Sequence, residues 1–231
     1  EHPWANAAEA AMIEEGEVVV AGDQKLRWDW SIGNIRNIGA FFGASFFSTF
    51  ADNLFVFWMP TFLVQDKGFS PAEMGIFASI PLFGGACGGL LGGILNDVLI
   101  RRMGSRKWAR RVIAGGCKVI AALLICSSLF FDDGRVVMGV LFFCKFFSDM
   151  SQPTWWGTVT DIGGPAAGRV FGMVNTVGAA GLFIAGPTMA WVKIQYDFDG
   201  LFYFVAVVYL VTTVCWMMVD CTRRLVIVDD R

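Results

Sequence analysis

The chain has 231 residues, of which 55% are apolar and only 16% are charged, and its formal net charge at pH 7 is −2. A soluble domain carries roughly 25% charged residues, so this composition excludes a water-soluble enzyme and a disordered chain. The apolar residues come in long blocks, which is typical of membrane-spanning helices. We therefore predict an all-α integral membrane protein whose surroundings are the lipid bilayer, with no nucleic acid as a partner.

Residues 1–35 open on an acidic stretch, and we expect them to be a cytoplasmic segment cut from a longer chain, since they begin without Met or a signal peptide. Six apolar blocks follow, each long enough for a bilayer core, which takes about 20 helical residues. The blocks run over residues 36–64, 71–95, 110–131, 136–159, 165–192 and 201–219. Because the connections are short, we predict one six-helix bundle, followed by a cytoplasmic tail over residues 220–231.

The basic residues are divided unequally between the two sides that these blocks define. One side receives only Lys67, Arg135 and Lys193. The other side receives 13, namely Lys25, Arg27, Arg36, Arg101, Arg102, Arg106, Lys107, Arg110, Arg111, Arg169, Arg223, Arg224 and Arg231. Short loops rich in Lys and Arg stay in the cytoplasm. This distribution predicts a multi-pass protein of the cell membrane (the plasma or inner membrane) with both ends of the segment cytoplasmic.

The first two blocks differ in their polar content. Asp52 and Asn53 continue a polar stripe in the first block, and we predict that at least one of them faces a solute pathway, because ionisable groups inside a membrane usually face a cavity or a partner. The second block instead holds a dense set of glycines, which are Gly84, Gly85, Gly88, Gly89, Gly92 and Gly93. Glycines let helices approach closely, so we expect tight packing and some pliability there.

The third and fourth blocks carry further ionisable residues. Lys118 has no partner at helical spacing, so we expect a structural residue that snorkels toward the basic loop. In the fourth block, Lys145, Asp149, Gln152 and Trp156 are spaced i, i+4, i+7 and i+11, and therefore share one helix face. One interpretation is that this face lines a cavity. The alternative is that Lys145 and Asp149 only form an internal ion pair.

The fifth block presents small residues and one amide on the same face. Gly168 and Gly172 permit close helix packing, and Asn175 follows one turn later. Asn175 can either join two helices by a hydrogen bond or bind a solute, and the pattern leaves both readings open.

Cysteine and histidine usage argues against cofactor chemistry. The six cysteines are scattered without a CxxC pair, and the lone histidine, His2, lies in the polar N-terminal segment. This pattern suggests neither a disulfide framework nor a zinc site. We expect no cofactor and no metal.

Several motifs resemble the major facilitator superfamily. The run Gly92-Gly93-Ile94-Leu95-Asn96-Asp97, followed by Arg101-Arg102-Met103-Gly104-Ser105-Arg106-Lys107, resembles that family's Gly-x-Leu-x-Asp-Arg-x-Gly-Arg-Arg loop, with three more residues between Asp and Arg. Further likeness lies in residues 57–63, 67–70, 79–81, 171–178 and 186–187, and in the opening residues 2–16. Together these features look like the anion:cation symporter branch, which moves sugar acids and other organic anions.

The resemblance implies a fold and a set of roles. It places the six blocks as helices seven to twelve of twelve, the C-terminal half of a transporter, with an inverted 3+3 repeat and a solute site between the halves. Blocks one and four would line the cavity, and Asn175 with the Trp155–Trp156 region would lie near the solute. Asp97 would cap the start of the fifth block in the outward-open state, while Arg101, Arg102 or Arg106 pairs with an acid such as Asp161.

The leading hypothesis is therefore secondary active transport of a small organic anion, driven by protons or sodium ions. Lys145, Gln152 and Asn175 can supply cationic and amide donors to a carboxylate, and Trp156 can pack on a sugar face. Asp149 or Asp52 can titrate or tune Lys145. The alternatives are a channel or structural membrane subunit, and less favoured, a membrane enzyme. The segment would need the missing N-terminal half of the same chain to complete its site.

Overall fold

The structure, a computed structural model, describes residues 26–228. The acidic N-terminal stretch and most of the predicted central-loop segment lie outside the described residues, as does the resemblance of residues 2–16. The elements in chain order are β1 (Leu26–Trp28), α2 (Ile32–Asn53), the π-helix η1 (Leu54–Trp58), α3 (Met59–Gln65), α4 (Pro71–Met103), α5 (Arg106–Ser127), the 3-10 turn η2 (Ser128–Phe130), α6 (Gly134–Met150), α7 (Gln152–Gly163), the 3-10 turn η3 (Gly164–Ala166), α8 (Ala167–Met218) and β2 (Val226–Val228).

Four helical stretches within residues 26–228 are long and apolar enough to cross a membrane. They are Ile32–Gln65, Pro71–Met103, Arg106–Phe130 and Gly134–Met218. The last has 85 residues, and at about 1.5 Å per residue a straight helix of that length would far exceed a bilayer. It is interrupted at Ser151, at Gly164 and at Asp197. The protein is therefore a helical membrane protein, and its last helical stretch changes direction at these breaks.

Local sequence explains where these helices begin, end and break. Ser70 and Glu73 form a reciprocal capping box at the start of α4, and Gly104 ends this helix in the left-handed conformation with φ of 62°. Pro153 cannot donate a hydrogen bond to the carbonyl of Asp149, which instead accepts from the Ser151 N–H where α6 gives way to α7. Asp197 has φ of 56° and ψ of −163°, and there α8 folds into two arms, residues 167–196 and 198–218.

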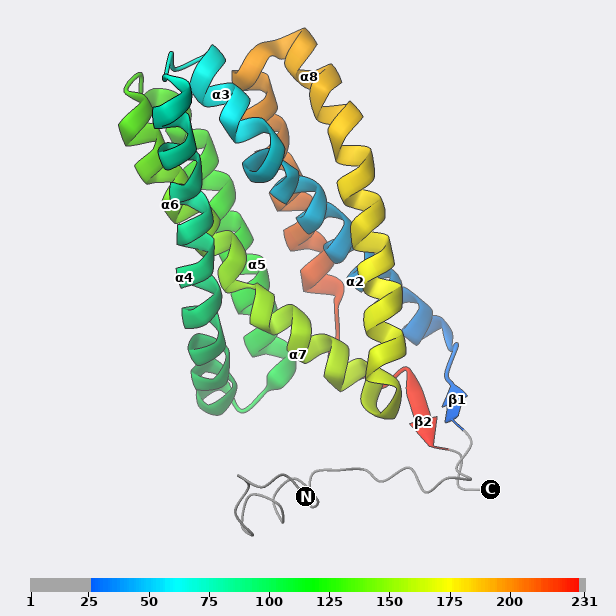
Figure 1. The fold of residues 1–231 in the computed structure, drawn as a ribbon. Coiled ribbons are helices and arrows are strands. Elements are labelled where there is room, and N and C mark those ends of the chain that lie inside the picture. The colour runs from blue at the N-terminus through cyan, green and yellow to red at the C-terminus, as the bar shows by residue number, and fades with distance from the viewer. Residues whose placement is uncertain (1–25, 229–231) are drawn as a thin grey trace, which may run out of the picture.

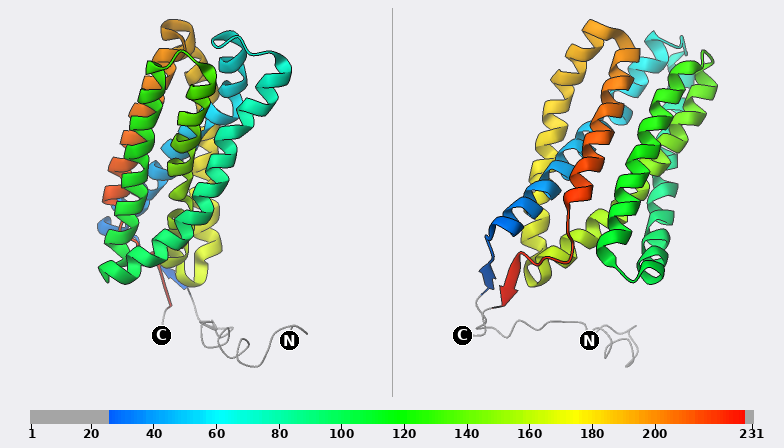
Figure 2. Two further views of the ribbon diagram at one scale, coloured as in Figure 1. Left: turned by 90° about the vertical axis from the view of Figure 1, so that its left-hand side faces the viewer. Right: turned by 180° about the vertical axis from the view of Figure 1, so that it is seen from behind.

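The helices pack in two groups joined along the middle of the bundle. In one group α4 packs on α6, and α6 on α5. In the other, α2 packs along α8, and α5 connects the groups by packing on α8 as well. Figure 1 shows α2 crossing the bundle obliquely beside the first arm of α8, and Figure 2 shows the second arm returning toward β2. Charged side chains of the two groups meet between them, since Asp52 of α2 pairs with Lys145 of α6.

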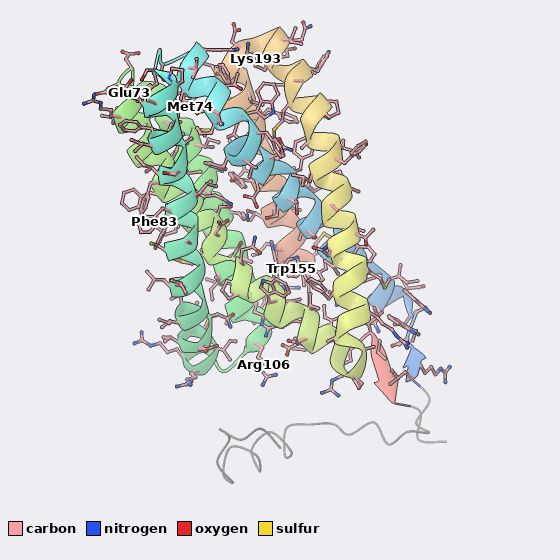
Figure 3. The ribbon with its side chains drawn as sticks, in the orientation of Figure 1. Glu73, Met74, Phe83, Arg106, Trp155 and Lys193 are labelled. Carbon is pink, nitrogen blue, oxygen red and sulfur yellow. The ribbon has the colours of Figure 1, made fainter. Side chains whose placement is uncertain are left out.

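The glycines of α4 form a close seam with α6. A Cβ atom on Gly84, Gly88 or Gly92 would meet a backbone carbonyl oxygen of α6, those of Phe142, Phe146 and Met150 respectively. Only glycine lets the two backbones approach this closely. The tight packing expected from the sequence is confirmed. The opposite side of α4 exposes Ile76, Phe83, Leu90 and Ile94, and Figure 3 shows Phe83 pointing away from the bundle, as suits contact with lipid.

A short antiparallel ribbon joins the two ends of the described chain. β1 pairs with β2 in the register Leu26 to Val228 and Trp28 to Val226. This ribbon is a departure from a purely α-helical fold, and it was not predicted, because three-residue strands in the tails depend on a partner almost two hundred residues away. The Asp29 N–H also donates to the Leu225 carbonyl, 2.9 Å away. The tails are thus ordered against each other next to the helix ends.

The two ends of the bundle differ in charge. The α4–α5 connection, the start of α8 and the β1–β2 ribbon lie together at one end (Figure 1). In Figure 3, Arg106 marks this end, whereas Glu73, Met74 and Lys193 lie at the other. The described members of the basic set therefore gather at a single end, which is named here the basic end.

Candidate functional site

The centre of the site is a cation held between two carboxylates. The Lys145 Nζ atom of α6 lies 2.9 Å from Asp52 Oδ1 of α2 and 2.6 Å from Asp149 Oδ1, one turn along its own helix. It also lies 5.7 Å from the centre of the Phe55 ring. Asp52 is the second-last residue of α2, separated by one residue from the start of the π-helical turn η1, and such turns are frequent at functional sites. We call Asp52, Lys145 and Asp149 the charged triad.

The charged triad combines burial with an unequal charge count. The Lys145 side chain is only 8% exposed, and the two carboxylates are each 19% exposed. Removing charges from water is costly unless they are paired, and ionisable groups within a membrane are typical of transport pathways. With two acids and one base ionised, the triad carries one surplus negative charge. That surplus is chemically able to take up a proton or another cation.

A small polar hollow lies beside the triad and has a volume of about 160 Å³. Its lining is made of hydroxyl, amide and indole groups from α2, α7 and α8, namely Ser45, Ser48, Thr49, Gln152, Trp155, Trp156 and Asn175. Three residues predicted to bind solute, Gln152, Trp156 and Asn175, thus meet in one place. Ser48 and Thr49 precede Asp52 by one helical turn, so the hollow adjoins the triad along α2.

The face predicted for residues 145–156 is divided by the structure. The helix breaks at Ser151, so Lys145 and Asp149 belong to the charged triad whereas Gln152 and Trp156 line the hollow. The single continuous face expected from an uninterrupted helix is therefore wrong in detail. Pro153 gives the reason, because a proline inside a helix removes a backbone hydrogen bond and bends the chain.

An aromatic wall closes one side of the hollow. Trp156 stacks on Phe171 of α8, with ring centres 5.0 Å apart and planes at 20°, and Trp155 lies edge-on to Trp156 at 5.1 Å. Figure 3 shows Trp155 in the middle of the bundle, where it also contacts Phe41 of α2. Trp156 is 54% exposed, which leaves an indole face open to a ligand or to further protein.

Asn53 occupies a different place from the other predicted binding residues. Its Nδ2 atom donates to the Leu182 carbonyl of α8 at 3.2 Å, and its buried Oδ1 atom has no hydrogen-bond partner within residues 26–228. Asn53 borders an apolar pocket of about 530 Å³ between η1, α3 and α8, together with Phe57, Trp58, Thr61, Ala179, Leu182, Phe183 and Gly186. Asp52 and Asn53 therefore point to different surroundings, since neighbouring helical residues face different directions.

Lys118 does not snorkel toward the basic loop, and that expectation is wrong. Its side chain is wholly buried, its Nζ atom donates to Ser148 Oγ of α6 at 2.8 Å, and it lies 5.1 Å from the centre of the Tyr209 ring. Spacing along one helix could not reveal this arrangement, because both partners come from other helices. Ser148 precedes Asp149, so Lys118 brings a second cation next to the charged triad.

A second charged cluster lies at the basic end. Asp161 of α7 contacts Arg110 at 2.8 Å and Arg106 at 3.6 Å, both from the first turns of α5. The sequence analysis included Arg106 among the predicted partners of Asp161 but not Arg110, which lies closer to Asp161 and is more buried. Among described residues, Arg101 and Arg102 make no ion pair, and Asp97 accepts only a 3.4 Å hydrogen bond from Asn96. The capping of α8 by Asp97, expected in the outward-open state, stays a prediction.

Within the described part of the chain, no group of three or more His, Cys, Asp or Glu side chains is placed to hold a metal ion. The chemistry that the described site offers is therefore ion pairing, hydrogen bonding and stacking.

Comparison with known proteins identifies the family. The model of the Major Facilitator Superfamily matches residues 41–224, which include nearly all the helices. The chain therefore belongs to this superfamily.

Its relatives specify the branch. The chain is 32% identical to a probable galactarate/D-glucarate transporter of Bacillus subtilis, GudP, over 77% of this chain and 41% of that protein. It is 27% identical to a probable galactarate/D-glucarate transporter of Escherichia coli, GarP, over 95% of this chain and 52% of that one. A D-galactonate transporter of Escherichia coli is 21% identical over 91% and 51%. The chain thus spans about half the length of these curated relatives.

Proposed function

We propose that this chain is the C-terminal half of a secondary active transporter that moves a small organic anion, such as a sugar acid, by alternating access. The buried pairing of one lysine with two carboxylates, beside a hollow lined with amides and indoles, is the observation that carries the proposal. The names of the relatives support the class of solute, because galactarate, D-glucarate and D-galactonate are all sugar acids. The partner that completes the cavity would be an N-terminal six-helix half.

The proposed membrane topology has six crossings. They are the stretches Ile32–Gln65, Pro71–Met103 and Arg106–Phe130, then α6 with α7, and then the two arms of α8. Two sets of three helices would form the inverted 3+3 repeat. The concentration of Lys and Arg at the basic end supports a cytoplasmic location for that end, and so for both termini, in the plasma or inner membrane.

Coupling can follow from the charge count of the triad. While both carboxylates are ionised, they balance Lys145 and the neighbouring Lys118, and a third negative group gains little from approaching Lys145. Uptake of a proton by Asp52 or Asp149 removes one of these charges and leaves the lysine available to a carboxylate of the solute. Gln152 and Asn175 would donate to solute oxygens, and Trp156 would pack on the carbon skeleton. A sodium ion held by the two carboxylates could replace the proton in the same scheme.

Closure of the basic end would involve the second charged cluster. The contacts of Asp161 with Arg106 and Arg110 join α7 to α5 and would hold this end shut until the halves move. Asp97, Arg101 and Arg102 would add contacts to neighbouring helices in another state of the cycle. Asp97→Asn should then slow transport while expression and thermal stability stay near normal, and a normal transport rate in this variant would remove Asp97 from the gate.

The decisive experiment measures radiolabelled galactarate in vesicles that contain the full-length transporter. Lys145→Gln should lower the affinity for galactarate about 10- to 100-fold, which corresponds to the loss of a charge-assisted hydrogen bond of about 1.5–3 kcal/mol. Asp149→Asn mimics the protonated acid, so it should keep solute counterflow but lose accumulation driven by a pH gradient. The matched control is Lys193→Gln, a partly exposed lysine at the other end of the bundle that should change neither measurement.

Two further outcomes would contradict the proposal. Normal galactarate affinity in Lys145→Gln would mean that this lysine only bridges helices. Flux without counterflow in the wild-type protein would indicate a channel. The 231-residue chain alone, reconstituted in the same vesicles, should show no saturable uptake, because the other half of the cavity is absent.

A further inference from the structure

A second cavity, unrelated to the polar hollow, opens at the basic end and has a volume of about 420 Å³. It lies where the start of α2, the start of α5 and the end of α8 come together. Its lining includes four cations and one carboxylate, and the complete set is Ile32, Gly33, Arg36, Asn37, Lys107, Arg111, Met217, Met218, Asp220 and Arg223. The cavity therefore has a strong excess of positive charge.

The single carboxylate of this cavity, Asp220, already forms ion pairs with two of its cations. Asp220 Oδ2 lies 2.7 Å from Lys107 Nζ and 3.8 Å from Arg223 Nε. The Arg111 Nε–H donates to the Val219 carbonyl at 2.8 Å and so neutralises part of the negative C-terminal end of α8. Arg36 is exposed and makes no ion pair within residues 26–228. Four cations against one carboxylate leave a formal excess of three positive charges to attract an anion.

The backbone reinforces this charge. α2 begins at Ile32 and α5 at Arg106, so the positive ends of two long helices lie near the cavity, and helix N-termini favour anions. At the start of α2 the Asp29 carboxylate already accepts from the Ser31 N–H at 3.0 Å, so the start of α5 contributes the larger part of this attraction. Gly33 lies in the first turn of α2, and a Cβ atom there would collide with the Arg223 guanidinium. Glycine at this position lets Arg223 lie directly against the backbone at the start of the helix.

The rim of the cavity is apolar and exposed. Ile32 is 87% exposed, and Met217 and Met218 are 39% and 43% exposed. Next to them, Trp108 is 53% exposed and carries the Arg111 guanidinium over its ring at 5.2 Å. Tryptophan and arginine gather at the level of lipid headgroups. A soluble inorganic anion would satisfy the cations but would leave these apolar side chains without a partner.

We infer that this cavity binds the phosphate group of an anionic phospholipid, with Arg36, Arg111 and Arg223 contacting the phosphate and the acyl chains lying over Ile32, Met217 and Met218. Basic pockets between membrane helices on the cytoplasmic side are suited to such headgroups. The bound lipid would bridge α2, α5 and α8. The inference does not depend on the identity of the transported solute.

Native mass spectrometry of the 231-residue chain in neutral detergent tests the site, with phosphatidylglycerol and phosphatidylcholine as probes. We expect the chain to retain phosphatidylglycerol over phosphatidylcholine of the same acyl composition. Arg36→Gln combined with Arg223→Gln should weaken phosphatidylglycerol binding roughly 25-fold, because each basic residue near an anionic headgroup contributes about five-fold in affinity. Arg36→Lys combined with Arg223→Lys keeps the charge and should retain most of the binding.

The matched control is Arg101→Gln combined with Arg102→Gln, which removes the same charge from the same end of the molecule but outside the cavity. It should leave the tightly bound lipid in place. Equal loss in this control, or no preference between the two lipids, would overturn the inference. Displacement of the lipid by millimolar inorganic phosphate would also overturn it, because the ligand would then be a soluble anion. Circular dichroism of each variant verifies that the helices are intact.

Discussion

The charged triad and the cluster around Asp161 use the same kinds of residues in opposite proportions. The triad has two acids on one lysine, and its lysine is 8% exposed. The Asp161 cluster has one acid between two arginines, of which Arg110 is 8% exposed and Arg106 is 65% exposed. The surplus negative charge of the triad lies in an enclosed place next to one further cation, Lys118, so uptake of a proton changes the local charge strongly, whereas a surplus positive charge near water is screened. We therefore propose that the charged triad takes up a proton or cation during transport, and that the Asp161 cluster holds α5 and α7 together.

The largest effect should come from removing the cation of the triad. Lys145→Gln leaves two enclosed carboxylates facing each other, and breaking a buried ion pair in this way costs about 3–5 kcal/mol. Thermal unfolding of the chain in detergent measures this loss. Asp149→Asn added to Lys145→Gln should restore much of the stability, since it removes one of the unpaired charges. A loss below about 1 kcal/mol would show that water reaches the triad freely.

The Asp161 cluster should depend on one of its two arginines. Arg110→Gln removes a short, buried contact and should destabilise the chain by about 2 kcal/mol, in the range for hydrogen bonds to charged groups. Arg106→Gln removes a longer, exposed contact and should cost less than about 1 kcal/mol. Both variants remove one positive charge from the first turns of α5, so they differ in the length and burial of the contact that is lost. Equal destabilisation by both would mean that charge, and not burial, sets the strength of this cluster.

The geometry of the triad can be disturbed from the neighbouring helix. A Cβ atom on Gly85 of α4 would meet Asp149 Oδ2 and would lie 3.1 Å from Lys145 Cγ, so Gly85→Ala should cost about 1–2 kcal/mol by overpacking. Gly89→Ala is the matched control, because nothing lies within 4 Å of its Cβ position. In a helix this change should stabilise by about 0.5–1 kcal/mol. Effects of the same sign would contradict the close contact between α4 and the triad.

The smallest effect concerns Asp220, the single carboxylate of the cavity at the basic end. Burial opposes ionisation, but hydrogen bonds from Lys107 and Thr222 outweigh it and hold the pKa of the Asp220 carboxyl below its usual value. A lowered folded-state pKa stabilises the protein above the unfolded value of about 3.9, and this contribution is lost as the pH falls through the folded-state pKa. Asp220→Asn should therefore lower stability by at most about 1 kcal/mol at pH 7 and flatten its dependence below pH 4. If the stability of Asp220→Asn depends on pH below pH 4 as that of the unchanged protein does, Asp220 makes no contribution to the loss of stability in acid.

The sequence predicted single helices better than the contacts between them. The glycines of α4 indicated a close seam, and that seam exists. Pairing along one helix was also visible, since Lys145 and Asp149 are four residues apart and do form an ion pair. The third member, Asp52, lies 93 residues from Lys145, and spacing carries no information over such a distance. The break at Asp197 lies in the predicted connection between residues 192 and 201, whereas the break at Ser151 was missed because it falls inside one continuous apolar block, residues 136–159.

What the sequence determined by itself is the membrane-spanning class, the family and the sidedness of the basic residues, because apolar length, local motifs and loop charge are properties of the linear chain. What only the tertiary structure decided is which charges meet. Lys118 was expected at the membrane edge but is buried and donates a hydrogen bond to Ser148. Asp161 lies closer to Arg110 than to Arg106. The segments next to the two ends of the described chain pair as strands. Each of these contacts joins different elements, so it exists only after the helices have packed and fixed which faces oppose each other.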